Sequence, residues 1–127
     1  MNRVVIGLGS NIDPKTNIHK AQQALKSKFT ILAQSAFIQT APIGYTDQDD
    51  FINGAILIET ELTQEELTQA LKQMEIQLGR TKSPIKSGPR SIDLDIVVWN
   101  DTIVDQDFYE RDFLKNSVLE LLPNLEY

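Results

Sequence analysis

The stretch FINGAILIETELTQEELTQALKQMEIQLG (residues 51–79) predicts a strand followed directly by a helix, and the other elements can be placed around it. Its first part, residues 51–62, is a short apolar run typical of a buried strand. Thr63 stands three residues before Glu66, which forms a capping box at the start of a helix, and Gly79 is a typical helix end. We therefore expect a strand and a well-defined helix here.

Further elements are predicted on both sides of this stretch. RVVIGLG (residues 3–9) is short, rich in β-branched residues and closed by glycines, so it predicts a buried strand. Asp13 and Pro14 fit the N-cap and first position of a helix over about residues 14–28. The same patterns predict a strand at residues 29–40, a polar loop at 41–50, a strand at 91–99 and a helix at 110–121.

The order of these elements is strand, helix, strand, strand, helix, strand and a closing helix. It predicts an α+β fold of the ferredoxin-like split β-α-β type, an antiparallel sheet with two helices packed on one face and the other face available. The chain of 127 residues with 41% hydrophobic composition predicts one domain over residues 1–127. A fold of this class does not by itself indicate a function.

Composition narrows the classes of partner. A formal net charge of −6 argues against sequence-independent binding to nucleic acid or to an anionic membrane. The sequence shows no apolar run long enough to span a membrane and no signal-peptide pattern, so we expect a cytoplasmic protein. We also expect it to act as a monomer. With no cysteine and one histidine, any metal must be held by oxygen, which favours magnesium.

The stretch SGPRSIDLDIVVWN (residues 87–100) places two carboxylates in an apolar strand. Alternation puts Asp93 and Asp95 on one face, with alpha carbons roughly 6.5 Å apart, so a positive group is expected nearby. One interpretation is a site in which the carboxylates hold divalent metal and the basic residues upstream bind phosphate. The other is a solvated strand face paired with a basic loop, and the charges alone favour it because D-x-D is a short pattern. The basic residues are Arg80, Lys82, Lys86 and Arg90.

Four separated motifs together carry a resemblance that reverses this preference. They are GLGSN at 7–11, QTAPIGYTDQDDFINGA at 39–55, LGR at 78–80 and GPRSIDLDI at 88–96. In this order they resemble the 6-hydroxymethyl-7,8-dihydropterin pyrophosphokinases of folate biosynthesis. The resemblance implies an enzyme that transfers the pyrophosphoryl group of ATP to the hydroxymethyl oxygen of a reduced pterin and releases AMP.

The resemblance also implies the roles of the charged residues. Asp93 and Asp95 would coordinate two Mg²⁺ ions that bridge the phosphates of ATP, with Asp93 also near the pterin. Arg90 resembles a phosphate-binding arginine, and Arg80 and Lys82 match positions in a loop that closes over ATP. The catalytic residues implied are Arg80, Arg90, Asp93 and Asp95, and the nucleotide-binding residues implied are Glu75, Lys82, Arg90, Ile96 and Arg111.

A pterin pocket is implied in the same way. A flat heteroaromatic ring needs faces to stack on and a few placed donors and acceptors. The pocket residues implied are Thr40, Ala41, Ile43, Phe51, Asn53, Asp93 and Phe113. Alternatives remain at several positions: the two phenylalanines could pack in the core, Thr40 could be an edge-strand residue, and Glu75 could lie on a solvated helix face. Gly7 and Gly9 fit neither dinucleotide spacing nor a P-loop, so a tight turn into the first helix is the better interpretation for them.

The chain departs from the family pattern on the nucleotide side. Residues 102–113 contain no histidine, although relatives commonly carry one there, and Ser87 stands where a large aromatic often lies. Arg111 and Phe113 keep the later spacing. These differences leave a second hypothesis open, a paralogue that binds a pterin without turnover, and a third, an interaction or regulatory domain with an accidental D-x-D.

Overall fold

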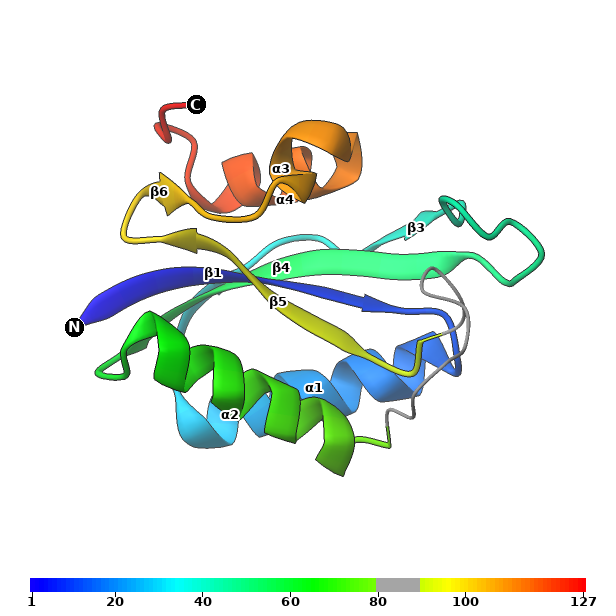
Figure 1. Cartoon of the computed structure of the whole chain (residues 1–127), viewed down its shortest axis with the longest axis horizontal. Helices are drawn as coiled ribbons and strands as arrows, with labels where there is room; N and C mark the ends of the chain where they lie inside the picture. The colour runs from blue at the N-terminus through cyan, green and yellow to red at the C-terminus, as the bar shows by residue number, and fades with distance from the viewer. Residues whose placement is uncertain (80–89) are drawn as a thin grey trace.

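A computed structural model describes residues 1–79 and 90–127 of the chain. Its six-stranded sheet has the order β2-β4-β1-β5-β6, with β3 paired to β4, and the pairings are antiparallel (Figure 1). The strands are β1 (Asn2–Ser10), β2 (Thr30–Gln34), β3 (Ile38–Thr40), β4 (Phe51–Thr60), β5 (Asp93–Trp99) and β6 (Thr102–Ile103). The helices are α1 (Pro14–Lys28), α2 (Gln64–Gln77), α3 (Asp107–Glu110) and α4 (Asp112–Leu121). The predicted α+β antiparallel fold is confirmed.

The two long helices begin in different ways. The capping box of α2 is present, because the Thr63 N–H donates to Glu66 Oε1 at 2.9 Å and the Glu66 N–H donates to Thr63 Oγ1 at 3.1 Å. In α1, Asp13 occupies the N-cap position and Pro14 the first turn, but Asp13 has a φ of 40° and makes no side-chain cap bond. The position of Asp13 was predicted correctly, but the side-chain cap is absent.

Alternation along the strands gives the sheet two apolar faces. Val4, Ile6 and Leu94 pack with α1 and α2 on one face, whereas Val5 and Val97 face the other. That second face is covered by α3 and α4 (Figure 1), with Phe108 and Val118 fully buried against it. The expectation that this face stays available is therefore wrong where these helices cover it. Their buried side chains supply a second core.

The predicted strand at residues 29–40 is divided into β2 and β3 by a break at residues 35–37. Ser35 is bonded to β4 at this point: its N–H donates to Ala55 O at 2.9 Å, and its Oγ accepts from the Ala55 N–H at 2.8 Å. The ring of Phe37 lies over Gly54, where an added Cβ would be 2.5 Å from the ring. The interruption is therefore stabilised by specific contacts with β4.

Other features of the secondary structure also differ from prediction. The predicted helix at 110–121 is preceded by the short helix α3, the strand at 51–62 ends at Thr60, and β6 was not predicted. None of the helices in the described part of the chain is long and apolar enough to cross a membrane.

Candidate functional site

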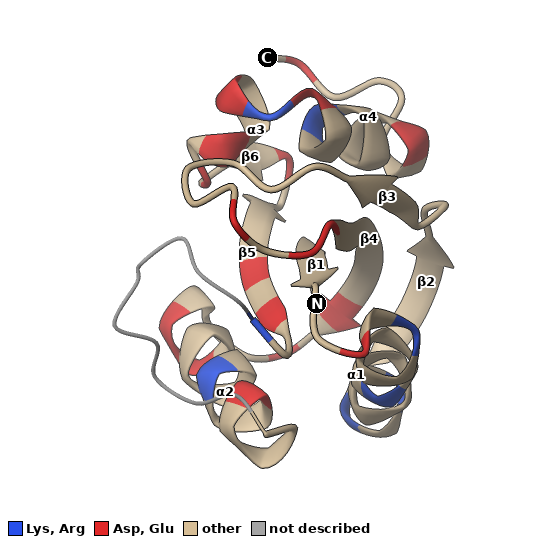
Figure 2. Ribbon diagram, turned by 90° about the vertical axis from the view of Figure 1, so that its right-hand side faces the viewer, with Lys and Arg blue, Asp and Glu red and all other residues tan. Residues whose placement is uncertain are grey.

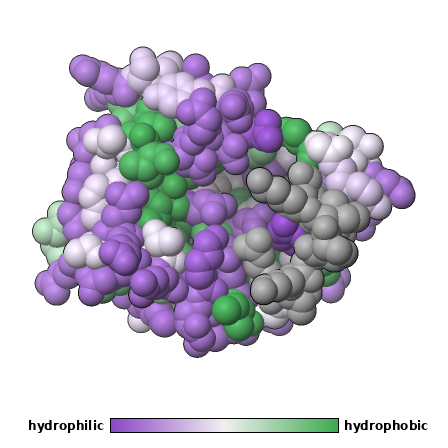
Figure 3. Space-filling model, viewed as in Figure 1, coloured by the Kyte–Doolittle hydropathy of each residue, from purple (hydrophilic) through white to green (hydrophobic). Residues whose placement is uncertain are grey.

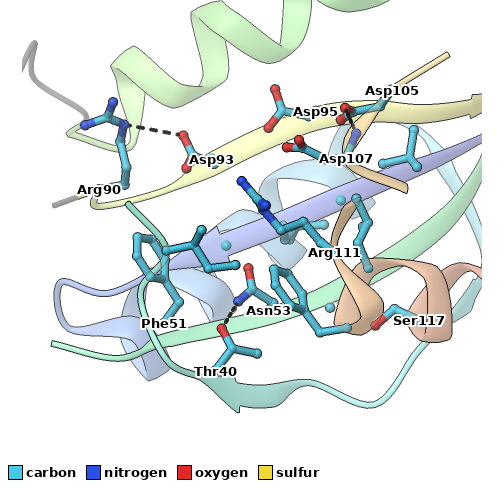
Figure 4. Close-up of a pocket in the computed structure, with 18 of the residues that line it drawn as sticks. Thr40, Phe51, Asn53, Arg90, Asp93, Asp95, Asp105, Asp107, Arg111 and Ser117 are labelled. Carbon is cyan, nitrogen blue, oxygen red and sulfur yellow. Dashed lines mark hydrogen bonds and ion pairs between the residues drawn. The ribbon is translucent and has the colours of Figure 1, made fainter. Parts of the chain in front are cut away.

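A cavity of about 250 Å³ lies between the sheet and the α3–α4 segment and gathers most of the predicted site residues (Figure 4). Figure 3 shows hydrophilic residues around a hollow near the middle of one face of the molecule. The predicted residues that line the cavity are Thr40, Ala41, Ile43, Phe51, Asn53, Arg90, Asp93, Asp95, Arg111 and Phe113. Segments far apart in the sequence therefore meet at one place.

The two carboxylates of β5 lie on the cavity side of the sheet, as alternation predicted. Leu94, between them, is buried on the opposite face. Their partners across the β1–β5 ladder are glycines, since Asp93 pairs with Gly9 and Asp95 with Gly7. A strand neighbour without a side chain leaves open space beside each carboxylate. The glycines belong to β1 and line the cavity floor, so the interpretation of a tight turn is wrong for them.

Each carboxylate has a cation nearby, which confirms the expected positive charge. Arg90 Nε lies 3.8 Å from Asp93 Oδ1, and Lys72 Nζ lies 3.5 Å from Asp95 Oδ1. Figure 2 shows the acidic positions along β5 and the basic residue that precedes them. Arg90 was predicted, but Lys72 was not. The solvated-face alternative also predicted ion pairs, but it does not account for the cavity that the same carboxylates line.

The polar wall opposite the carboxylates contains an ordered amide. Asn53 Nδ2 donates to Thr40 Oγ1 at 2.6 Å, which joins β4 to the end of β3. A Cβ added to Gly9 would lie 2.6 Å from Asn53 Oδ1, so the glycine is required for this amide to lie over β1. Phe51 and Phe113 line the same cavity from β4 and α4. Asn53 therefore has a side-chain hydrogen-bond partner in Thr40.

The segment after β6 supplies charged residues to the cavity. Asp105 and Asp107, which sequence reasoning missed, line it together with Arg111. Burial is the main cause that raises the pKa of the Asp105 carboxyl, and the carboxylates of Asp107 and Asp95 act in the same direction. The Asp107 N–H donates to Asp105 Oδ1 at 2.9 Å and opposes this shift. The acidic residues in VDQDFYERD (residues 104–112) were the sequence signal that could have indicated these carboxylates.

Glu75 does not lie on a solvated helix face, so that alternative is wrong. Its residue surface is 2% exposed, and Oε2 accepts the Leu94 N–H at 2.7 Å. Glu75 is therefore bonded to the backbone between the two aspartates. Ile96 packs against the core under α1 and α2, and neither it nor Glu75 is among the residues that line the cavity. Nucleotide binding by both stays a prediction.

Asn11 is a further residue that sequence reasoning did not single out. It is 5% exposed, and its Oδ1 accepts the Arg90 N–H at 2.8 Å while its N–H donates to Arg90 O at 3.1 Å. Its Nδ2 donates to Gln48 Oε1 at 2.7 Å and to Asp49 O at 3.1 Å. Asn11 thus joins the end of β1 to Arg90 and to the loop before β4. The GLGSN motif contained it, but its nonlocal partners carry no sequence signal.

The predicted positions Arg80 and Lys82 lie outside the described residues, as do Lys86 and Ser87. The catalytic and nucleotide-binding roles assigned to Arg80 and Lys82 stay predictions.

Comparison with known proteins agrees with the resemblance noted in the sequence. Residues 5–123 match the model of the family described as 7,8-dihydro-6-hydroxymethylpterin-pyrophosphokinase. The chain is 35% identical to the 2-amino-4-hydroxy-6-hydroxymethyldihydropteridine pyrophosphokinase of Bacillus subtilis, over 99% of this chain and 82% of that protein. The enzyme of the same name from Aquifex aeolicus is 34% identical over 98% of this chain and 83% of its own length.

Longer relatives match as well. A mitochondrial folate synthesis bifunctional protein from Pisum sativum is 37% identical, over 94% of this chain but only 25% of its own length. The family match covers nearly the whole chain, including both aspartates of β5 and the residues of the cavity from Gly7 to Ser117. The chain therefore belongs to the 7,8-dihydro-6-hydroxymethylpterin-pyrophosphokinase family, whose enzymes use ATP to pyrophosphorylate a hydroxymethyl-dihydropterin in folate synthesis.

Proposed function

We propose that the cavity between β5 and the α3–α4 segment is where the pyrophosphoryl transfer of this family takes place. The hydroxymethyl oxygen of the pterin attacks the β-phosphorus of ATP, the bond from that phosphorus to the α–β bridging oxygen breaks, AMP leaves with that oxygen, and the hydroxyl proton passes to water. The observation that carries this proposal is that Asp93 and Asp95 share one cavity with the Asn53–Thr40 amide site. Both reactants can therefore lie beside each other.

The donor set of this cavity fits magnesium. Asp93 and Asp95 offer carboxylate oxygens on one wall of the cavity. The described residues contain no group of three or more His, Cys, Asp or Glu placed to hold a metal, so the protein would supply these two carboxylates as ligands. Such a pair leaves coordination positions for phosphate oxygens and water, which Mg²⁺ favours. We propose that these two residues hold two Mg²⁺ ions, which supply positive charge to the phosphate oxygens during the transfer.

The uncharged part of the cavity would hold the pterin. Asn53 would present its amide to the polar edge of the ring, oriented by the hydrogen bond to Thr40. Phe51 and Phe113 would supply the stacking faces, because both line the same cavity as that amide. Ala41 and Ile43 line the same cavity and would border the ring.

The cationic part would hold the phosphates of ATP. Arg90 lines the cavity at the start of β5, and the guanidinium of Arg111 points into it from the start of α4 (Figure 4). Within residues 1–79 and 90–127, Arg111 makes no side-chain hydrogen bond or ion pair, so its planar fork can bind phosphate oxygens. Arg80, Lys82, Glu75 and Ile96 complete the proposed nucleotide site.

The direct test mixes purified protein with 6-hydroxymethyl-7,8-dihydropterin, ATP and Mg²⁺, and separates nucleotides and pterins by chromatography. We expect AMP and pyrophosphorylated pterin in equal amounts, since the transfer makes one of each. Unchanged ATP with a folded protein that still binds the pterin would contradict the proposal and favour the paralogue without turnover. A protein that binds neither ligand would favour the interaction domain.

Asn11 provides a test of how Arg90 and the loop before β4 are held at the end of β1. Replacing Asn11 with alanine removes the acceptor of the Arg90 N–H and the donor to the loop before β4. We expect the rate of AMP formation to fall about tenfold and the free energy of unfolding to fall by about 1–2 kcal/mol, because buried polar partners are lost. Asn17→Ala is the control, since the Asn17 side chain donates locally to Ile12 O. Equal rates in the two variants would contradict this role.

The proposal includes one domain formed by residues 1–127, which acts as a monomer in the cytoplasm, where ATP is available. The sheet supports the single domain, because β1 pairs on its two sides with strands from the middle and the last third of the chain. Sedimentation of the purified protein at working concentration tests the monomer, and a sedimentation coefficient fitting a dimer would contradict it.

A further inference from the structure

Lys72 lies on α2, outside the cavity, and contacts a carboxylate that lines it. Its Nζ is 3.5 Å from Asp95 Oδ1 and 3.5 Å from Glu75 Oε1. The Lys72 and Asp95 side chains are 51% and 53% exposed, respectively, whereas the Glu75 side chain is 3% exposed. One ammonium group therefore joins a buried carboxylate to an accessible one.

Glu75 is held in place by the backbone of β5 and can keep the ammonium group of Lys72 nearby. Its Oε2 accepts the Leu94 N–H at 2.7 Å. At Leu94, one edge of β5 pairs with β1, and the other edge is not reached by β6, which pairs with Val98 and Trp99. The carboxylate thus takes the place of a neighbouring strand at this edge. A buried carboxylate bonded to the backbone holds its position, so Lys72 can stay at Glu75 when it leaves Asp95.

The cations of the two aspartates come from different directions. Arg90 precedes β5 and lines the cavity, so it lies on the side where phosphate would bind. Lys72 approaches Asp95 from α2 and does not line the cavity. A monovalent ammonium on a flexible stem and a divalent ion compete for the same carboxylate oxygens, and the ammonium is the more easily displaced.

We propose that Lys72 is the counter-ion of Asp95 in the metal-free protein and is displaced from it when a divalent cation binds. The inference rests on the proposed function, because it takes Asp95 as a metal ligand. Lys72 is a positioning residue: it lowers the affinity of the Asp95 site for metal, and Glu75 holds the displaced ammonium group of Lys72 at the edge of β5. Binding of the metal ion at Asp95 then depends on the negative charge of the bound ATP.

The test measures Mn²⁺ binding by the electron paramagnetic resonance signal of free Mn²⁺, in the absence of nucleotide. Lys72→Met keeps much of the side chain and removes the charge, so we expect Mn²⁺ to bind roughly threefold tighter, the effect of losing one exposed ion pair. Lys72→Arg should resemble the unaltered protein. Lys26→Met, on the exposed side of α1, controls for the change in net charge.

Asp95→Asn separates this inference from the proposed function. In an Asp95→Asn background, Lys72→Met should leave Mn²⁺ affinity unchanged, because the competition for Asp95 is gone. An equal or weaker Mn²⁺ affinity in Lys72→Met alone, or an equal gain in Lys26→Met, would overturn the role of Lys72. If Asp95→Asn itself binds Mn²⁺ as the unaltered protein does, the metal assignment fails, and this inference fails with it.

Discussion

Replacing Asp95 with asparagine is expected to lower kcat for AMP formation by about a thousandfold, because it removes a negative ligand for the metal ions that neutralise the phosphates. The amide has nearly the shape of the carboxylate, so packing in the cavity is preserved. The Asp95 side chain is 53% exposed, and its ion pair with Lys72 is a surface contact that contributes little to stability. The variant should therefore remain folded.

The measurement is the initial rate at saturating ATP, pterin and Mg²⁺, together with the thermal unfolding midpoint of each protein. Asp101→Asn is the matched control, because it is the same chemical change at an exposed position with a φ of 68°, which asparagine also tolerates. A wild-type rate in Asp95→Asn would refute the metal assignment. Loss of activity accompanied by unfolding would refute the expected separation between catalysis and stability.

Replacing Asn53 with alanine is expected to raise the dissociation constant of the pterin about tenfold to a hundredfold. The ring's polar edge would lose its amide partner, and an unmatched buried polar group costs about 1–3 kcal/mol. The Thr40 hydroxyl would lose the donor that now lies at 2.6 Å. The effect should fall on pterin binding, because Arg90 and Asp95 belong to other walls of the cavity.

Titration of the pterin into the protein with a non-hydrolysable ATP analogue measures this effect directly. Asn116→Ala, at an exposed position on α4, is the control for loss of an asparagine. Thr40→Val should weaken pterin binding less, since it leaves the Asn53 amide in place and removes only the group that orients it. An unchanged dissociation constant in a stable Asn53→Ala protein would rule out the proposed contact.

Local patterns predicted most of the fold. The strands β1 and β5 and the capping box of α2 depend on neighbouring residues, and all three are present. The break between β2 and β3 could not be predicted in this way, because it depends on Ser35 and Phe37 contacting β4 about twenty residues later. The covered second face also depends on nonlocal packing, in which Phe108 and Val118 are buried against the sheet.

The same distinction applies to the candidate site. The shared face of Asp93 and Asp95 followed from the period of a strand, and the structure confirms it. Lys72 and Asn11 have partners that only the tertiary structure brings near. The solvated-face alternative for Glu75 misread a local signal, because Glu75 follows Leu71 by four residues and so lies on the buried side of α2.

The topology of the sheet also has a consequence for the order of assembly during synthesis. β2, β4 and β1 can pair once residues 2–60 have left the ribosome, whereas the other side of β1 is occupied by β5, which is made later. Pairing across such a sequence separation closes a long loop and is intrinsically slow. The nascent chain can thus hold a partly formed sheet before the strand that carries Asp93 and Asp95 has been made.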